Sequence, residues 1–162
     1  MKLHQTRNDL PESARHKCVT LLNDNLASAI DLALQAKQAH WNVKGPHFIS
    51  LHELFDKVAE ELEEFSDGIA ERAVELGGIA LGTIQVVSKG SRLKPYPLSS
   101  VSGREHVSAL SDALANFGAT VRAAIDAAGR AGDAYTADLF TEVSRGVDKL
   151  LWMIEAHLQA QD

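Results

Sequence analysis

The sequence predicts an all-α protein, a four-helix bundle in which a long crossover carrying a short helix joins helices two and three. Composition supports helix over sheet, because alanine and leucine abound while aromatic residues make up 6% of the 162 residues. Four long segments place apolar residues at alternating steps of three and four, the pattern of helices in a bundle. Only one connection, residues 79–100, is long and interrupted by glycine and proline.

The first helix is expected to begin near Pro11, since proline suits the first helical position and an acid follows it. It is expected to end before Gly45-Pro46, because the residue before a proline disfavours helix. Residues 1–10 are polar and are expected to form a short mobile tail. The rest, residues 11–162, is expected to be one domain.

The second helix is expected over residues 48–76, and Gly77-Gly78 is a plausible C-terminal stop. The connection that follows is expected to hold a short helix at residues 83–88. So long a connection suits a crossover between parallel neighbours. Two further amphipathic helices are expected, over residues 102–131 and 135–159.

Charge and cysteine content restrict the classes of function. The formal net charge is −6, so the body of the protein is suited to attracting cations rather than phosphate backbones. Cys18 is the only cysteine, which precludes an intrachain disulfide and fits a reducing compartment; its expected role is packing. With no apolar run of ~20 residues and no signal-peptide core, we expect a soluble, cytoplasmic protein.

Two pairs of potential metal ligands lie on the second helix: His52 with Asp56, and Asp67 with Glu71. A spacing of four puts each pair on one face, and at ~100° per residue all four fall within about 100°. Imidazole with carboxylates suits iron, zinc or manganese. Each pair taken alone is also common on a solvated helix surface.

The separation of the pairs is more informative. Eleven residues divide Asp56 from Asp67, or ~16 Å along the axis, so one metal ion cannot use both pairs of one helix. Either there are two separate sites, or a second copy of the chain completes each one. Antiparallel packing of two such helices about a two-fold axis would place the first pair of one copy beside the second pair of the other.

His40 fits a site shared in this way. It is about as far before the Gly45-Pro46 turn as His52 is after it, so the two imidazoles should face each other. Bundles that hold two irons within one chain use a Glu-x-x-His motif, which is missing here. The proposed donors suit Fe(II): from one chain His40, His52 and Asp56, and from its mate Asp67 and Glu71.

Nearly the whole chain resembles the Dps family, the ferritin-like mini-ferritins of bacteria. The resemblance lies in "AKQAHWNVKGPHFISLHELFD", "DGIAERAVELGGIALGT", "LKPYPL" and "TADLFTEVSRGVDKLLWMIEAHLQ". The family's ligand pattern is His, His-x-x-x-Asp and Asp-x-x-x-Glu, and it maps without a gap onto His40, His52, Asp56, Asp67 and Glu71. The resemblance implies a ferritin-like bundle assembled into a hollow dodecamer that stores iron as ferric oxyhydroxide. It also implies ferroxidase sites at two-fold interfaces, with hydrogen peroxide as the preferred oxidant.

The resemblance assigns roles to three more residues. Trp41 follows a proposed ligand and would lie near the iron, where it is a candidate electron donor or radical trap. Asp133 and Asp138 flank a turn that resembles the family's three-fold pore, where rings of carboxylates would draw Fe²⁺ inward. Asp138 is alternatively a helix cap, or binds nothing.

The remaining polar and aromatic residues are given simpler roles. Trp152 is expected to pack in the core or an interface. The acidic run Glu60, Glu63 and Glu64 is either a solvated face or, facing a cavity, a place where ferric mineral nucleates. Four histidines are expected at solvated positions: His16, His47, His106 and His157.

An alternative function is a nucleoid-associated protein that binds DNA directly and whose acidic stripe is purely structural. Several members of the Dps family bind DNA through lysine-rich N-terminal tails. This N-terminus carries Lys2 and Arg7 against Asp9, with no lysine cluster, so few phosphate contacts are expected from each copy. Repetition over a shell would restore some avidity. Removal of iron and peroxide would protect DNA without any contact.

Overall fold

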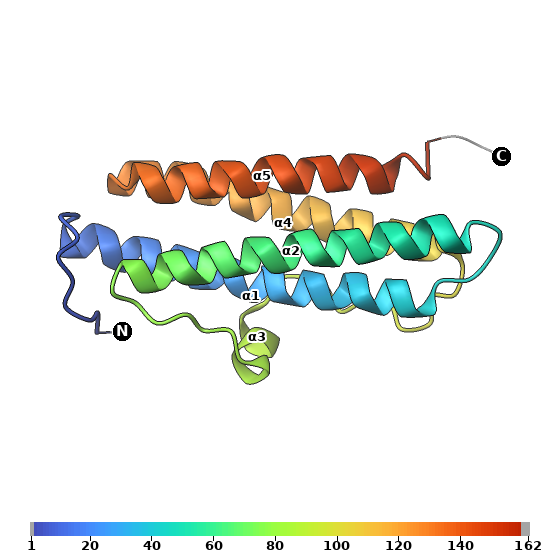
Figure 1. The fold of residues 1–162 in the computed structure, drawn as a ribbon, viewed down its shortest axis with the longest axis horizontal. Coiled ribbons are helices and arrows are strands. Elements are labelled where there is room, and N and C mark those ends of the chain that lie inside the picture. The colour runs from blue at the N-terminus through green and yellow to red at the C-terminus, as the bar shows by residue number, and fades with distance from the viewer. Residues whose placement is uncertain (1, 160–162) are drawn as a thin grey trace.

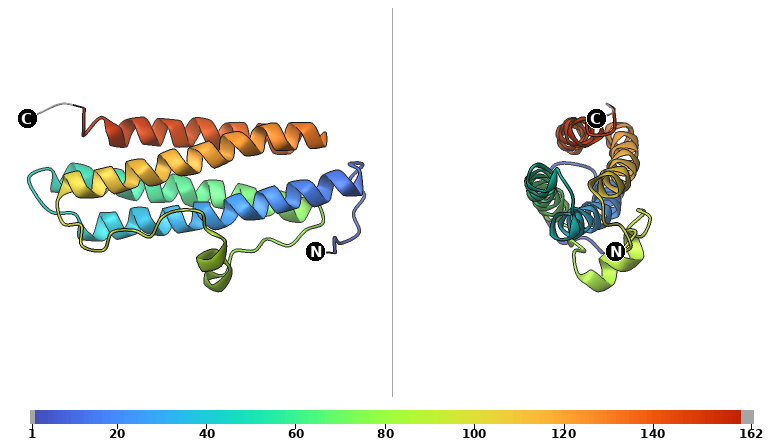
Figure 2. Two further views of the ribbon diagram at one scale, coloured as in Figure 1. Left: turned by 180° about the vertical axis from the view of Figure 1, so that it is seen from behind. Right: turned by 90° about the vertical axis from the view of Figure 1, so that its right-hand side faces the viewer.

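A computed structural model describes residues 2–159 of the chain. In that part of the chain all regular secondary structure is helical, as predicted, and four long helices form a bundle with a fifth, short helix outside it (Figures 1 and 2). The helices are α1 (Glu12–Asn42), α2 (Phe48–Glu75), α3 (Ile84–Gly90), α4 (Gly103–Ala131) and α5 (Ala134–Glu155).

The bundle consists of two antiparallel helix pairs, α1 with α2 and α4 with α5. These pairs share the most extensive contacts, and α1 joins them by packing on α4. The shared core is apolar, and three of its largest side chains, Phe55, Phe117 and Phe140, are fully buried. Burying a phenylalanine stabilises the fold by ~1.5–3 kcal/mol, so this core fixes the register in which the helices present their polar faces.

Helix ends fall close to the predicted positions, except that α5 ends at Glu155, four residues early. The start of α4 carries a capping box that the periodicity did not reveal. The Ser102 side chain accepts a hydrogen bond from the Glu105 backbone, and the Glu105 carboxylate accepts from Ser102 in return. Backbone and side-chain hydrogen bonds from Val101 and Ser102 lower the pKa of Glu105 to about 2.

The crossover, residues 76–102, runs along the outside of α1 and carries α3, which begins and ends slightly later than predicted (Figure 1). Polar side chains on the outer face of α1 hold it. Asn23 donates to the Ile79 carbonyl at 3.0 Å and accepts from the Leu81 amide at 2.8 Å. Asp31 accepts from the Ser91 hydroxyl at 2.5 Å. The crossover is therefore anchored along α1 rather than left as a loose loop.

The N-terminal segment, expected to be a mobile tail, lies against the end of α2. The His4 amide donates to the Gly77 carbonyl at 2.7 Å. Arg15 donates to the Leu10 carbonyl at 3.2 Å and to the Leu76 carbonyl at 3.1 Å. A Cβ atom at Gly77, whose φ is +84°, would approach the His4 carbonyl oxygen to 2.6 Å, so glycine is needed for this docking.

Candidate metal centre

The three donors expected from one chain meet at the end of the bundle where α1 turns into α2. His40 lies in the last turn of α1, and His52 and Asp56 lie in the first turns of α2. We call these three residues the half-site. The imidazole rings of His40 and His52 stack with centroids 3.7 Å apart and planes 20° apart. The Nδ1 atom of His40 lies 3.8 Å from the Asp56 carboxylate.

Reciprocal hydrogen bonds fix the proton positions on the two histidines. His40 Nδ1 lies 2.8 Å from the His52 carbonyl oxygen, and His52 Nδ1 lies 2.8 Å from the His40 carbonyl oxygen. A carbonyl only accepts, so each Nδ1 carries the hydrogen and each Nε2 of the neutral ring keeps its lone pair. Metal-binding histidines are usually held in this way, with the second nitrogen donating to a carbonyl or carboxylate.

Lys37, three residues before His40, completes the surroundings of Asp56. Its ammonium group lies 2.5 Å from the Asp56 carboxylate. The hydrogen bond from Lys37 is the largest influence holding the pKa of Asp56 below its usual range. Asp56 is therefore an anion beside two imidazoles, on a side chain that is 36% exposed and accessible to a cation from outside.

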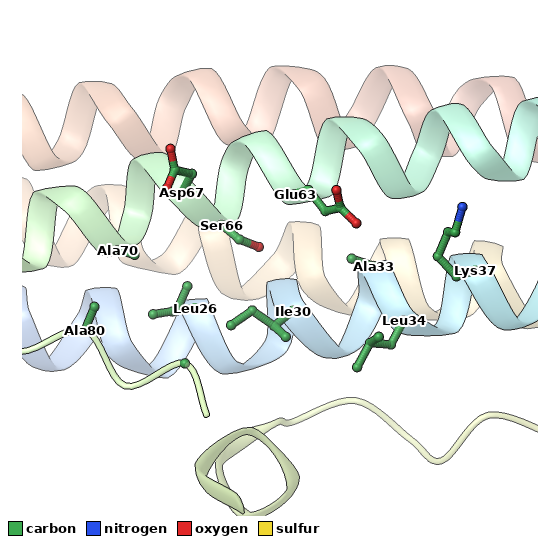
Figure 3. Close-up of a pocket in the computed structure, with 11 residues that line it drawn as sticks. Leu26, Ile30, Ala33, Leu34, Lys37, Glu63, Ser66, Asp67, Ala70 and Ala80 are labelled. Carbon is green, nitrogen blue, oxygen red and sulfur yellow. The ribbon is translucent and has the colours of Figure 1, made fainter. Parts of the chain in front are cut away.

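The other two expected donors, Asp67 and Glu71, lie further along α2 and are exposed. Asp67 lines an apolar groove of about 430 Å³ between α1 and α2, with Ile30 and Leu34 on its opposite wall (Figure 3). Glu71 lines an adjoining hollow. The structure thus brings three of the five donors together and leaves the second pair apart on the same helix.

The described part of one chain supplies only a portion of a metal site. Within residues 2–159, no three histidine, cysteine, aspartate or glutamate side chains are arranged to hold an ion by themselves. The half-site offers two imidazole nitrogens and one carboxylate, which is a borderline donor set, and Asp67 and Glu71 offer two hard carboxylates. Joined, they would suit a divalent first-row metal such as Fe(II).

The two tryptophans and the acidic run lie on the surface of the chain. Trp41 is 65% exposed beside His40, and the geometry leaves its expected role in electron donation untested. Trp152 is also exposed, so within this chain it is not a core residue. Glu60, Glu63 and Glu64 are exposed on α2, and Glu63 lines the groove (Figure 3).

Asp133 does not have the free carboxylate that a pore residue needs, which corrects the sequence-based expectation. It is 1% exposed and is the N-cap of α5, accepting from the Thr136 amide at 3.0 Å. Arg72 donates to both of its oxygens, at 3.0 and 3.2 Å. Burial raises the pKa of Asp133, but hydrogen bonds from Thr136 and the charge of Arg72 outweigh it, and the net shift is downward. Asp138 is exposed, and its role in a pore stays a prediction.

His106 and Cys18 are both buried. His106 was expected at a solvated position, but it is 1% exposed, and its Nδ1 lies 2.6 Å from the Tyr96 hydroxyl. Cys18 packs in the core as expected, and burial raises the pKa of its thiol to about 12. The structure gives His47 and His157 exposed positions, as predicted.

Comparison with known proteins agrees with this architecture. Residues 19–161 match the ferritin-like domain family. The chain is 50% identical over 159 residues to the DNA protection during starvation protein of Agrobacterium fabrum, covering 98% of each chain. It is 31% identical over 147 residues to the protein of the same name from Brevibacillus brevis, covering 91% of this chain and 98% of the relative.

Solved structures agree as well. DpsC from Streptomyces coelicolor superposes with a TM-score of 0.95 at 29% identity, over 99% of this chain and 94% of that one. The Dps protein of Vibrio cholerae, described as a member of the ferritin-like diiron-carboxylate superfamily, gives 0.90 at 26% identity, over 98% and 99%. No helix in the described part of the chain is long and apolar enough to span a membrane. The chain belongs to the Dps family of ferritin-like proteins.

Proposed function

We propose that the protein is a ferroxidase and iron store that oxidises Fe(II), preferably with hydrogen peroxide, and holds the product as ferric oxyhydroxide inside a dodecamer. Iron is the substrate. Each site would take His40, His52 and Asp56 from one subunit and Asp67 and Glu71 from its two-fold mate. The observation that carries the proposal is the half-site, in which two stacked imidazoles with fixed Nδ1 protons and one ionised carboxylate stand at the surface.

The groove supports a shared site. Its apolar walls, with the exposed side chains of Leu34 in the groove and Val74 in the adjoining hollow, form a face suited to burial against another protein surface. Asp67 and Glu71 lie at this face. A second copy packed antiparallel here would bring its own half-site to those carboxylates, and two-fold symmetry would make two identical sites.

The half-site residues divide the chemical work. The two Nε2 lone pairs and the Asp56 carboxylate would bind Fe(II), and the partner's carboxylates would favour the higher charge of Fe(III). Lys37 supplies the positive charge at Asp56 in this structure, and an arriving cation would replace that contact. Peroxide consumed at such a site is withheld from free Fe(II), which would protect DNA chemically.

Direct DNA binding is the competing explanation of the relatives' name, DNA protection during starvation. The N-terminal segment makes it the weaker candidate, because its cationic side chains are Lys2 and Arg7 against Asp9, on a protein whose net charge is −6. It predicts salt-sensitive gel shifts that are lost when residues 1–10 are removed. It also predicts that changes at the half-site leave DNA protection intact.

The ferroxidase proposal is tested by replacing His52 and Asp56 together with alanine. Loss of a group that merely supports a metal ligand costs about 10–100-fold, so loss of two ligands should slow peroxide-dependent Fe(II) oxidation by at least that factor. His157→Ala, on an exposed position, is the matched control. Size-exclusion chromatography should show the same assembly for all variants. Oxidation at the original rate in the double variant would refute the proposal.

A further inference from the structure

A tyrosine and a histidine form a hydrogen-bonded pair that the proposed ferroxidase site does not use. Tyr96 comes from the crossover and His106 from the first turn of α4, and the Tyr96 hydroxyl lies 2.6 Å from His106 Nδ1. Their rings are nearly parallel, with 17° between the planes and 6.0 Å between the centroids. His106 is buried, and Tyr96 is half-buried between the core and the surface.

The direction of the hydrogen bond follows from the surroundings. Burial lowers the pKa of His106, so the ring is neutral at neutral pH, and burial raises the pKa of Tyr96, so the phenol keeps its proton. The phenol therefore donates to Nδ1, and the ring carries its own hydrogen on Nε2. A hydrogen bond with the Asn42 backbone and the charge of Glu105 act against the effect of burial on the pKa of His106, and the net shift is downward.

Such a pair has a specific chemical capability. A phenol that loses an electron becomes strongly acidic, and a buried phenol gives up an electron readily only if a base stands ready for its proton. His106 Nδ1 is that base, within the distance at which a positioned side chain accepts a proton. The negative charge of neighbouring Glu105 favours the imidazolium that would result. The proton never has to reach solvent.

Phe55 links the pair to the helix that carries His52 and Asp56. Phe55 precedes Asp56 in α2, and its fully buried ring lies 6.3 Å from the His106 ring, centroid to centroid. Buried side chains therefore connect the helix of the half-site with His106, and through His106 with Tyr96. The chain holds one other tyrosine, Tyr135, which is exposed and stacked on Arg72.

We propose that Tyr96 and His106 form a redox site that intercepts one-electron oxidising equivalents produced beside the half-site. This inference rests on the proposed function for its oxidant: Fe(II) and hydrogen peroxide give Fe(III), hydroxide and a hydroxyl radical. Tyr96 passes one electron to that radical, which becomes hydroxide, and its phenolic proton moves to His106 Nδ1. A neutral tyrosyl radical and an imidazolium remain. A second Fe(II) then reduces the radical while the proton returns, so that one peroxide oxidises two Fe(II).

The first experiment needs no iron. A photogenerated ruthenium(III) polypyridyl complex oxidises the whole protein, and electron paramagnetic resonance records the tyrosyl radical, with ring-deuterated tyrosine separating it from tryptophan signals. Tyr96→Phe removes one oxygen atom, and Tyr135→Phe is the matched control. The long-lived tyrosyl signal should be lost in the first variant, kept in the second, and lost in His106→Leu, with circular dichroism confirming that each variant is folded. A signal that survives Tyr96→Phe, or is undiminished in His106→Leu, refutes the assignment of a redox site to Tyr96 and His106.

The second experiment adds peroxide to protein preloaded with Fe(II). The same radical should appear in wild type and in Tyr135→Phe but be lost in Tyr96→Phe, while hydroxyl-radical trapping by an external spin trap should rise in that variant. Iron oxidation without a Tyr96 radical and without extra spin adduct overturns the inference and leaves the ferroxidase intact. If iron is not oxidised at all, the proposed function fails, and the photochemical result decides the redox competence of the pair independently.

Discussion

Asp133 offers a clear test of the structure, because the family resemblance implies a pore residue at this position and the structure places Asp133 in a buried ion pair with Arg72. Asp133→Ala leaves the Arg72 guanidinium, 5% exposed, with Thr136 and the half-exposed Glu75 as its remaining hydrogen-bond partners. Breaking a buried pair on one side costs ~3–5 kcal/mol, which here includes the lost cap of α5. Because Glu75 remains, we expect the lower end, about 3 kcal/mol, and a fall in Tm of roughly 6–12 °C.

The assay is urea and thermal unfolding followed by circular dichroism, at equal protein concentrations because assembly shifts apparent stability. Asp138→Ala, at an exposed position, is the control and should stay within ~0.5 kcal/mol of wild type. The folded-state pKa of Asp133 is lowered, so its stabilisation is present above the unfolded value of ~3.9 and is lost as pH falls through the folded value. In Asp133→Asn the free energy of unfolding should therefore depend less on pH in the acid range. A loss below 1 kcal/mol, together with slower iron entry, would restore the pore assignment.

Two further predictions concern the half-site and the backbone. Lys37→Met should raise the pKa of Asp56 toward its ordinary value, as measured by carboxyl NMR titration. Because an exposed ion pair is worth ~0.2–1 kcal/mol, the affinity for Zn(II) measured by calorimetry should rise up to about fivefold. Weaker Zn(II) binding would contradict the inference that Lys37 and the metal ion compete for the Asp56 carboxylate. Gly78→Ala should destabilise by ~1–3 kcal/mol, because its Cβ atom would approach the Ala73 carbonyl oxygen to 2.7 Å and a Val19 methyl group to 2.5 Å. Gly129→Ala in α4, whose Cβ atom would meet nothing within 4 Å, should instead stabilise by ~0.5–1 kcal/mol, and the same sign for both would be evidence against the packing described.

The helices and the meeting of His40 with His52 were predictable because both depend on local geometry. Apolar spacing sets which face of each helix is buried, and a short turn forces equally distant residues together. The contact of Lys37 with Asp56 was missed, although Lys37 lies one helical turn before His40 and so shares its face. Lys37 contacts Asp56 because α1 and α2 pack in one register. The core determines that register, and it cannot be derived from the pattern of a single helix.

The structure differs from the expectations for His106 and Asp133 for two reasons. His106 was assigned to a solvated position without reference to helix phase, and Asp133 was assigned to a pore from the family resemblance alone. His106 lies four residues before Leu110 and eleven before Phe117, on the buried face of α4, so its burial could have been read from spacing. Asp133 follows a glycine and precedes Thr136 by three residues, the pattern of a helix start. Its partner Arg72 was not predictable, because that contact spans 61 residues and depends on how α5 lies on α2.

The central claim is that two chains share each iron site, and complementation between two inactive variants measures it most directly. One variant carries His52→Ala and Asp56→Ala, and the other carries Asp67→Ala and Glu71→Ala. In a mixed two-fold pair, one site receives all five donors and the other receives only His40. Random mixing makes about half of the pairs mixed, so co-assembled protein should recover about a quarter of wild-type peroxide-dependent Fe(II) oxidation, while each variant alone stays inactive. No recovery in shells shown to contain both variants would contradict the shared site.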